Sequence, residues 1–167
     1  MNRRSILGIC ATTALGFALP GSAIAQQKSL KDQLTGTWIN VANTITARDG
    51  SKRPAFGPHP KGILILAASE YYAQFITNSD LPKFKLNDRL KGTPEENEAV
   101  VHGTIAHYGT WSVDEASKTL TRRIEANMFP NQTATKQSIT LTGDELKLVN
   151  TNASTGGIIE NVYKRAK

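Results

Sequence analysis

The chain has almost no cysteine. Its single cysteine, Cys10, lies in an apolar N-terminal stretch, so the sequence that follows can form no disulfide and has no thiolate nucleophile. The three histidines, His59, His102 and His107, do not follow the spacing of metal ligands, and no glycine-rich phosphate loop or serine nucleophile elbow is present. These absences predict that no metal or other cofactor is used, and they leave stability to a packed core.

The chain also has no hydrophobic run long enough to span a membrane. Residues Met1–Ala25 have a basic head containing Arg3 and Arg4, an apolar run, a Pro-Gly pair and then small residues. An apolar run of about 14 residues is too short for a hydrocarbon core of about 30 Å, and the layout predicts a secretory signal peptide cleaved before Gln26. The paired arginines leave the general and the twin-arginine export routes open. We therefore expect a periplasmic or secreted protein without a stable membrane anchor after cleavage.

Concentrated positive charge is missing as well. The formal net charge is +6, but the lysines and arginines are scattered and are not interleaved with stacking aromatic residues. This distribution argues against nucleic-acid binding. Residues 26–167 contain no repeat, linker or low-complexity tract and have the length of one ordinary domain. We expect that domain to be a monomer or a weak oligomer.

What the chain does contain is a series of short alternating segments separated by turn signals. One short helix interrupts them, because Thr93, Pro94 and Glu96 have the spacing of a capped helix start, and Gly103 is its expected end. The alternation predicts eight strands, at Thr37–Ala47, 63–68, 71–78, Thr104–Val113, Thr119–Ala126, Thr135–Leu141, Glu145–Asn150 and Ile158–Lys164.

The predicted fold class is all-β: an eight-stranded antiparallel up-and-down barrel with one short helix inserted before the fourth strand. Closure into a barrel is favoured because it removes both exposed edges of the sheet. A barrel of this size can hold its own side chains or one small ligand. The alternative is a sandwich of two sheets.

The first strand carries a motif with a known counterpart. Its stretch Gly36-Thr37-Trp38 resembles the Gly-x-Trp signature of lipocalins and their calycin relatives. Four further stretches, FGPHPKG, GTPEENEAVVHGTIAHYGTWSVDE, RRIEANMFPN and LTGDELKL, resemble the bacterial lipocalin-like domain family. The resemblance spans about Leu34 to Ala166 and implies a lipocalin-like barrel with an internal cavity. It also implies that Trp38 closes the barrel floor under Arg165, with Lys164 as the alternative partner.

Two positively charged or titratable residues stand on strands at positions that should face inward. The apolar face of Thr104–Val113 includes His107 and Trp111, and the apolar face of the next strand includes Arg122 but not Arg123. A shift of one residue in register would exchange the two arginines. A buried guanidinium without a partner costs several kcal/mol, so Arg122 needs a carboxylate, carbonyls, water or a ligand. We expect His107 and Arg122 to form a cationic region that binds a carboxylate or enolate-like oxygen of an amphipathic ligand.

Several other residues are candidates for the cavity wall or mouth. His59 lies between two prolines, whose rigid backbone could hold its side chain over the barrel mouth. For His59 the structural alternative is a surface histidine, for His107 it is an ordinary core histidine, and for the aromatic residues it is plain packing. The remaining candidates for the lining are Tyr71, Tyr72, Gln74, Phe75 and Tyr108.

The function that these features favour is an exported carrier that binds a small hydrophobic or amphipathic molecule inside its barrel. Some relatives in the family that the chain resembles occur with small-molecule biosynthesis, which implies an alternative, a cofactor-independent isomerase or cyclase. In that case His107 or a tyrosine would move protons while Arg122 stabilises negative charge. A third possibility is a partner-binding module whose barrel is filled by its own side chains.

Overall fold

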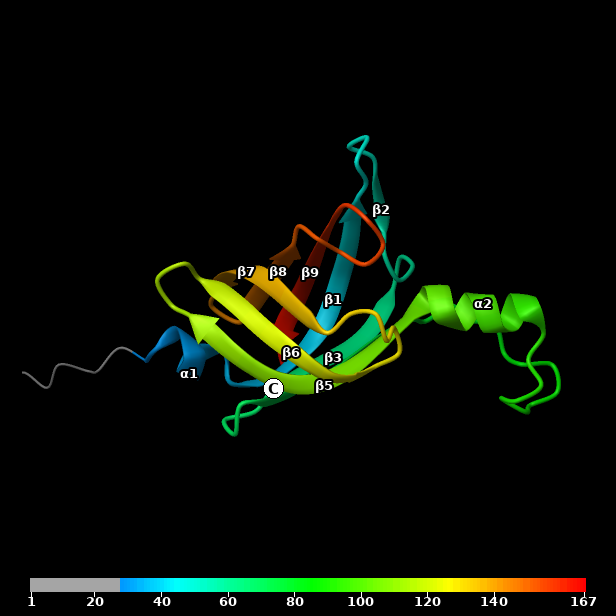
Figure 1. Cartoon of the computed structure of the whole chain (residues 1–167), viewed down its shortest axis with the longest axis horizontal. Coiled ribbons are helices and arrows are strands. Elements are labelled where there is room, and N and C mark those ends of the chain that lie inside the picture. Colours follow the sequence, from blue (N-terminus) through cyan, green and yellow to red (C-terminus); the bar gives the residue numbers. More distant parts are fainter. Residues whose placement is uncertain (1–27) are drawn as a thin grey trace, which may run out of the picture.

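Consecutive antiparallel pairing carries the chain around a closed ring of strands (Figure 1). The computed structural model describes residues 28–167, so the signal peptide predicted for residues 1–25 lies outside the described residues. The barrel strands are β1 (Gly36–Thr46), β3 (Pro60–Leu66), β4 (Tyr71–Asn78), β5 (Thr104–Asp114), β6 (Thr119–Asn127), β7 (Ala134–Thr142), β8 (Glu145–Asn150) and β9 (Ile158–Arg165). β1 pairs with β3 on one side and with β9 on the other, which confirms the predicted eight-stranded barrel rather than a sandwich.

The predicted helix is present as α2 (Pro94–Gly103) and extends away from the barrel (Figure 1). The hydroxyl of Thr93 accepts a hydrogen bond from the Glu96 backbone N–H, and the Glu96 carboxylate accepts one from the Thr93 N–H at 2.8 Å. The capping box therefore forms as the sequence predicts. Of the helices in residues 28–167, none is long and apolar enough to cross a membrane.

Two short elements were not predicted. β2 (Lys52–Pro54) extends the sheet by pairing with the C-terminal end of β1, and α1 (Leu30–Leu34) precedes the barrel. Both are too short for their periodicity to be read from the sequence. Figure 1 shows α1 and α2 at opposite ends of the barrel.

A tryptophan and an arginine fill the closed end beside α1. The Trp38 side chain is fully buried, and its indole Nε1 donates a hydrogen bond to the Leu34 carbonyl at 2.8 Å. The Arg165 guanidinium lies 4.1 Å from the centroid of that indole and donates to the carbonyls of Gln33 and Thr35. Gly36 between them has φ +134°, and a Cβ there would lie 3.2 Å from a guanidinium nitrogen, so this position favours glycine. Arg165 is therefore the partner of Trp38.

The alternation of β1 differs from the predicted one because the strand contains a bulge. In the sequence, the apolar positions Ile39 and Ile45 share one phase of the alternation, opposite Trp38 and Asn40, which predicts a single face for both isoleucines. The register of β1 against β9, however, shifts between Asn40 and Ala42. Before the bulge Asn40 is buried and Ile39 is 42% exposed, and after it Ile45 is buried. One extra residue reverses which positions face the interior.

The hydrophobic core occupies the half of the barrel next to α1. It contains the side chains of Leu34, Trp38, Leu64, Leu66, Tyr72, Ile76, Trp111, Leu120, Ile139, Leu146, Leu148 and Tyr163. These residues come from every barrel strand, so the core ties the closed ring together at one end. The other end is left to a cavity.

We expect Arg165→Ala to lower the free energy of unfolding by about 1–3 kcal/mol, because it removes the stacking on Trp38 and two hydrogen bonds to backbone carbonyls. Arg165→Lys keeps the charge but loses the planar fork, so it should recover only part of that stability. Urea unfolding measures both. Lys164→Ala is the matched control, since Lys164 is exposed and its loss should matter by less than about 0.5 kcal/mol. An Arg165→Ala protein as stable as the wild type would contradict this role.

Candidate ligand-binding cavity

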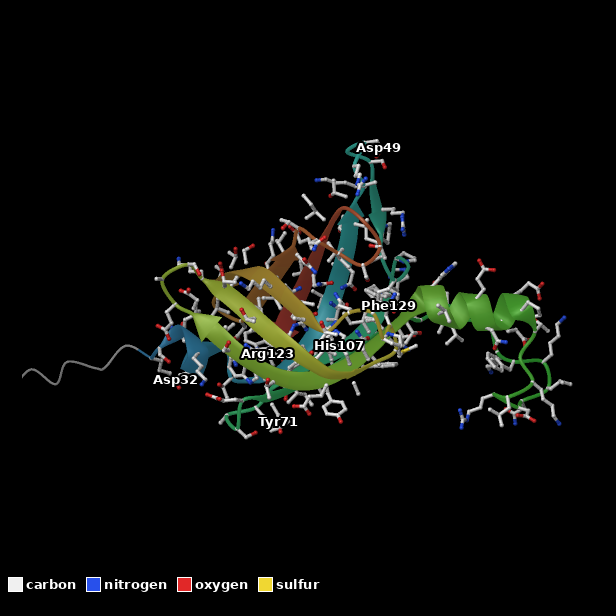
Figure 2. The ribbon with its side chains drawn as sticks, in the orientation of Figure 1. Asp32, Asp49, Tyr71, His107, Arg123 and Phe129 are labelled. Atoms are coloured by element: carbon white, nitrogen blue, oxygen red, sulfur yellow. The ribbon has the colours of Figure 1, made fainter. Side chains whose placement is uncertain are left out.

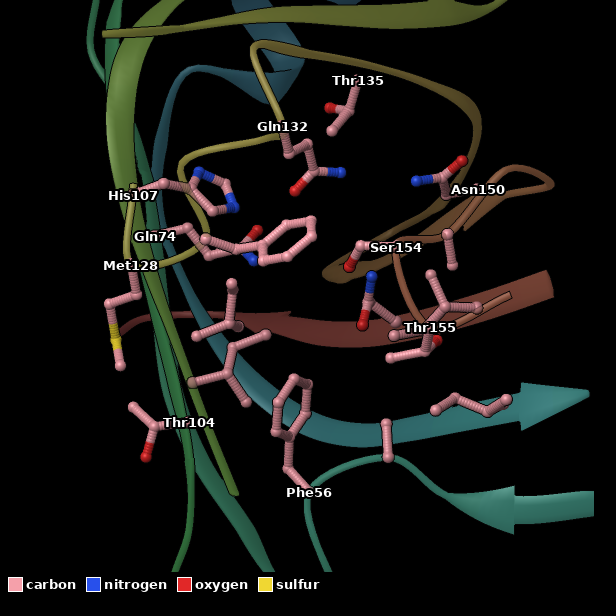
Figure 3. Close-up of a pocket in the computed structure, with 18 of the residues that line it drawn as sticks. Phe56, Gln74, Thr104, His107, Met128, Gln132, Thr135, Asn150, Ser154 and Thr155 are labelled. Carbon is pink, nitrogen blue, oxygen red and sulfur yellow. The ribbon is translucent and has the colours of Figure 1, made fainter. Parts of the chain in front are cut away.

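A cavity of about 550 Å³ lies between the hydrophobic core and the end of the barrel that carries α2 (Figure 3). This volume is within the range of pockets that hold small molecules. Its outer part is partly exposed and contains apolar side chains together with polar ones such as Arg53, Gln132 and Ser154, and its deep part is polar and buried. The outer apolar residues include Phe56, Val101, Ile105, Met128, Phe129 and Ile159, and the deep polar residues include Gln74, His107, Arg122, Thr135 and Gln137.

Arg122 forms the deepest charged part of the cavity wall. Its side chain is 2% exposed and points inward, while that of Arg123 is exposed, which confirms the predicted register of β6. The guanidinium donates to the hydroxyl of Thr135 at 3.2 Å and to the amide oxygens of Gln74 and Gln137 at 2.5 and 2.6 Å. Its carbon also lies 5.2 Å from the ring centroid of Tyr72. Four neighbours from strands β4 and β7 thus hold the group in one place.

All these partners of Arg122 are neutral. No aspartate or glutamate lines the cavity, and among residues 28–167 no carboxylate lies within salt-bridge distance of the guanidinium. Arginine stays protonated in proteins, so the side chain places a full positive charge in a buried site without a counter-charge. Such a charge is costly unless something negative compensates it. The arrangement is therefore suited to an anionic group.

His107 lies on the adjacent strand β5, faces the cavity (Figure 3), and contacts Tyr72 as Arg122 does. Its side chain is 7% exposed, and its Nδ1 lies 2.9 Å from the Tyr72 hydroxyl. Burial, together with the positive charge of Arg122, lowers the pKa of His107 from 6.5 to about 3. His107 is consequently neutral at neutral pH, so the buried positive charge of the cavity comes from Arg122, while Arg53 places a second, exposed positive charge on the outer lining.

The structure places the other predicted site residues at different depths. Gln74 lines the cavity and bonds Arg122, whereas Trp111 is buried in the core and donates from Nε1 to the Ala67 carbonyl at 3.0 Å. Trp111 lies on the predicted inward face, but too close to the closed end to reach the cavity. His59 is exposed and is not among the cavity residues, so it is a surface histidine rather than part of the cavity lining.

The expectation that Tyr71, Phe75 and Tyr108 line the cavity is also wrong. Their side chains are 45–50% exposed and stand on the outer surface of the barrel, as Figure 2 shows for Tyr71. Successive residues of a strand point to opposite faces, so the inward Tyr72 and Gln74 require their neighbours to point outward. The strand neighbours of these three residues, Tyr72, Gln74 and His107, are the ones that point inward.

Sequence analysis missed Thr135 and Gln137, which hold Arg122. Polar side chains on a strand usually face solvent, so neither residue stood out as a candidate for the cavity. The signal was present in β7, because Thr135 and Gln137 share the alternation of Ile139, which is buried in the core.

In residues 28–167 no group of three metal-ligating side chains is placed to hold a metal ion.

A closed antiparallel barrel with one sealed end and a ligand-sized cavity at the other is the architecture of a lipocalin-type binding protein. A family model for the lipocalin-like domain matches residues 35–165. The match covers every barrel strand, and the chain belongs to the lipocalin-like domain family. Comparison with curated proteins gives no match.

We expect acid to destabilise the protein through His107. The unfolded chain gains a proton near pH 6.5, whereas the folded His107 resists protonation down to about pH 3, so stability falls as the pH drops below 6.5. Between pH 7 and pH 5 this group alone should cost about 2 kcal/mol. Urea unfolding of wild type and His107→Gln at both pH values measures the difference. Parallel losses in the two proteins would contradict the buried neutral state of His107.

Proposed function

We propose that the protein is exported and binds a small amphipathic molecule inside its barrel, with a carboxylate or similar oxyanion at Arg122. In this pose the apolar part of the ligand extends toward the outer part of the cavity, past side chains such as Phe56 and Phe129. The observation that carries the proposal is the buried guanidinium without a carboxylate partner, at the deep end of a cavity that contains no acidic residue.

The hydrogen bonds of Arg122 leave capacity for such a group. A guanidinium has five N–H donors, and the Nε and the two terminal nitrogens each donate to one protein side chain. The two terminal nitrogens therefore keep further N–H groups for a ligand. An oxyanion there would gain charge-assisted hydrogen bonds and would balance the buried positive charge.

The same geometry favours binding over proton-transfer catalysis. A general base works best when its pKa is close to the working pH, and a pKa of about 3 makes His107 a weak base at neutral pH. Its Nδ1 is also engaged with the Tyr72 hydroxyl. The cavity volume of about 550 Å³ argues against a barrel filled by its own side chains. A carrier is thus better supported than an isomerase, a cyclase or a partner-binding module.

Export rests on the sequence of residues Met1–Ala25, whose basic head, short apolar run and small residues before Gln26 have the layout of a signal peptide. The cysteine-free chain after Gln26 gives no preference between reducing and oxidising compartments. We assign the mature protein to the periplasm or the external medium.

The anion site predicts how Arg122 variants bind decanoic acid. Arg122→Ala should weaken binding by about 10-fold to 100-fold, because it removes charge-assisted hydrogen bonds, and Arg122→Lys should recover part of the loss. Isothermal titration calorimetry measures the affinities. Binding of decanol, which has no charge, should change much less. Arg123→Ala is the matched control, since this exposed neighbour points away from the cavity and its loss should leave both affinities unchanged. Wild-type affinity for decanoate in Arg122→Ala would remove the proposed anion site.

Export predicts the mature N-terminus. Intact-mass measurement of the protein from the periplasmic fraction of cells that produce it should give a chain that starts at Gln26. The same preparation, measured under native conditions, would show a co-purifying small molecule as an added mass. A full-length chain with Met1, found only in the cytoplasmic fraction, would contradict export.

A further inference from the structure

Two buried amide side chains form a polar strip on the cavity wall away from Arg122. Asn150 is 7% exposed and Asn161 is 4% exposed, and both line the cavity. Asn161 pairs with Leu148 across β8 and β9, and Asn150 lies two residues further along β8. The two asparagines are therefore diagonal neighbours on the inner face of adjacent strands.

The hydrogen bonds of Asn150 settle which end of its amide faces the cavity. Its Oδ1 accepts a hydrogen bond from the backbone N–H of Asn152 at 2.9 Å, in the turn that follows β8. A backbone N–H can only donate, so the oxygen belongs to the turn and the NH₂ group points into the cavity (Figure 3). Within the described part of the chain this NH₂ group donates no hydrogen bond to protein.

Asn161 presents the same group, and its partner is the side-chain amide of Asn43 rather than a backbone group. Its Oδ1 accepts from the Nδ2 of Asn43 at 2.6 Å, on the neighbouring strand β1. With its oxygen engaged, Asn161 also keeps its NH₂ group for the cavity. Two donors of the same kind thus stand side by side on one wall, whereas Ile76, Ile105 and Met128 line the cavity with apolar side chains from β4, β5 and the segment after β6.

The strip lies between the anion site and the outer part of the cavity. Asn150 is the last residue of β8, and the loop that follows contributes Ser154 and Thr155 to the cavity lining. Both loop residues are exposed, whereas Arg122 is buried against Tyr72 of the core. A ligand with its oxyanion at Arg122 would therefore pass the two amides before it reaches the rim.

Resting on the function proposed above, we propose that the amide groups of Asn150 and Asn161 recognise an oxygen on the body of the ligand. The ligand class is then an oxygenated carboxylic acid, with a keto, hydroxy or ester oxygen between its acid group and its apolar end, rather than a saturated fatty acid. Buried donors that lack acceptors are costly, so a site built with them discriminates against a ligand that cannot accept their hydrogen bonds.

The test compares decanoic acid with a series of decanoic acids that carry one ketone at successive chain positions. Titration calorimetry of the wild-type protein should find at least one isomer that binds about tenfold more tightly than decanoic acid, which is the effect of one buried hydrogen bond. Asn150→Ser keeps an oxygen for the turn but removes the NH₂ group, and it should reduce that preference to about twofold, because the ketone loses its donor and decanoic acid no longer leaves one unpaired. Asn161→Ser tests the second amide independently, and Asn152→Ala, whose backbone N–H remains, is the matched control.

The outcomes separate this inference from the proposed function. In one outcome, decanoic acid binds through Arg122 but no ketone isomer binds more than about twofold more tightly. That result would overturn the amide strip and leave the anion site standing. A preference for a ketone isomer that survives unchanged in both Asn150→Ser and Asn161→Ser would also overturn the amide strip and leave the anion site standing. If neither the saturated nor the oxygenated acids bind, both proposals are wrong.

Discussion

The positive charge of Arg122 is the constraint on which the rest of this structure depends. The guanidinium is 2% exposed, and three neutral side chains, Gln74, Thr135 and Gln137, hold it in place. Neutral partners fix its position but do not balance its charge. The barrel tolerates the group because closure of the strands surrounds it with oriented oxygens, and a compensating anion can enter only through the cavity.

The two inward arginines show how one residue type serves opposite ends of the barrel. Arg165 stacks on Trp38 and donates to backbone carbonyls, so its environment is completed by the protein itself and seals the closed end. Arg122 donates to side chains, keeps further N–H groups and faces about 550 Å³ of cavity. The first arrangement stabilises the fold, and the second leaves an interaction for a ligand to make.

The sequence predicted the barrel well because strand alternation and closure depend on local patterns, and it placed His107 and Arg122 inward for the same reason. It failed at Tyr71 and Tyr108, where aromatic character was taken as a sign of lining although their strand positions face outward. The bulge after Asn40 could not be read, because one inserted residue leaves no compositional signal. Trp111 faces inward as predicted, but its depth along the barrel depends on which end is sealed, and that is a tertiary feature.

A crystal structure of the protein with decanoic acid tests the central claim most directly, because the pose depends on the charge of Arg122. The account predicts that the carboxylate lies within hydrogen-bond distance of the Arg122 guanidinium, with the alkyl chain directed toward Phe56 and Phe129. A carboxylate held at the rim beside Arg53, with the alkyl chain against the guanidinium, would contradict it, as would a cavity closed by the protein's own side chains.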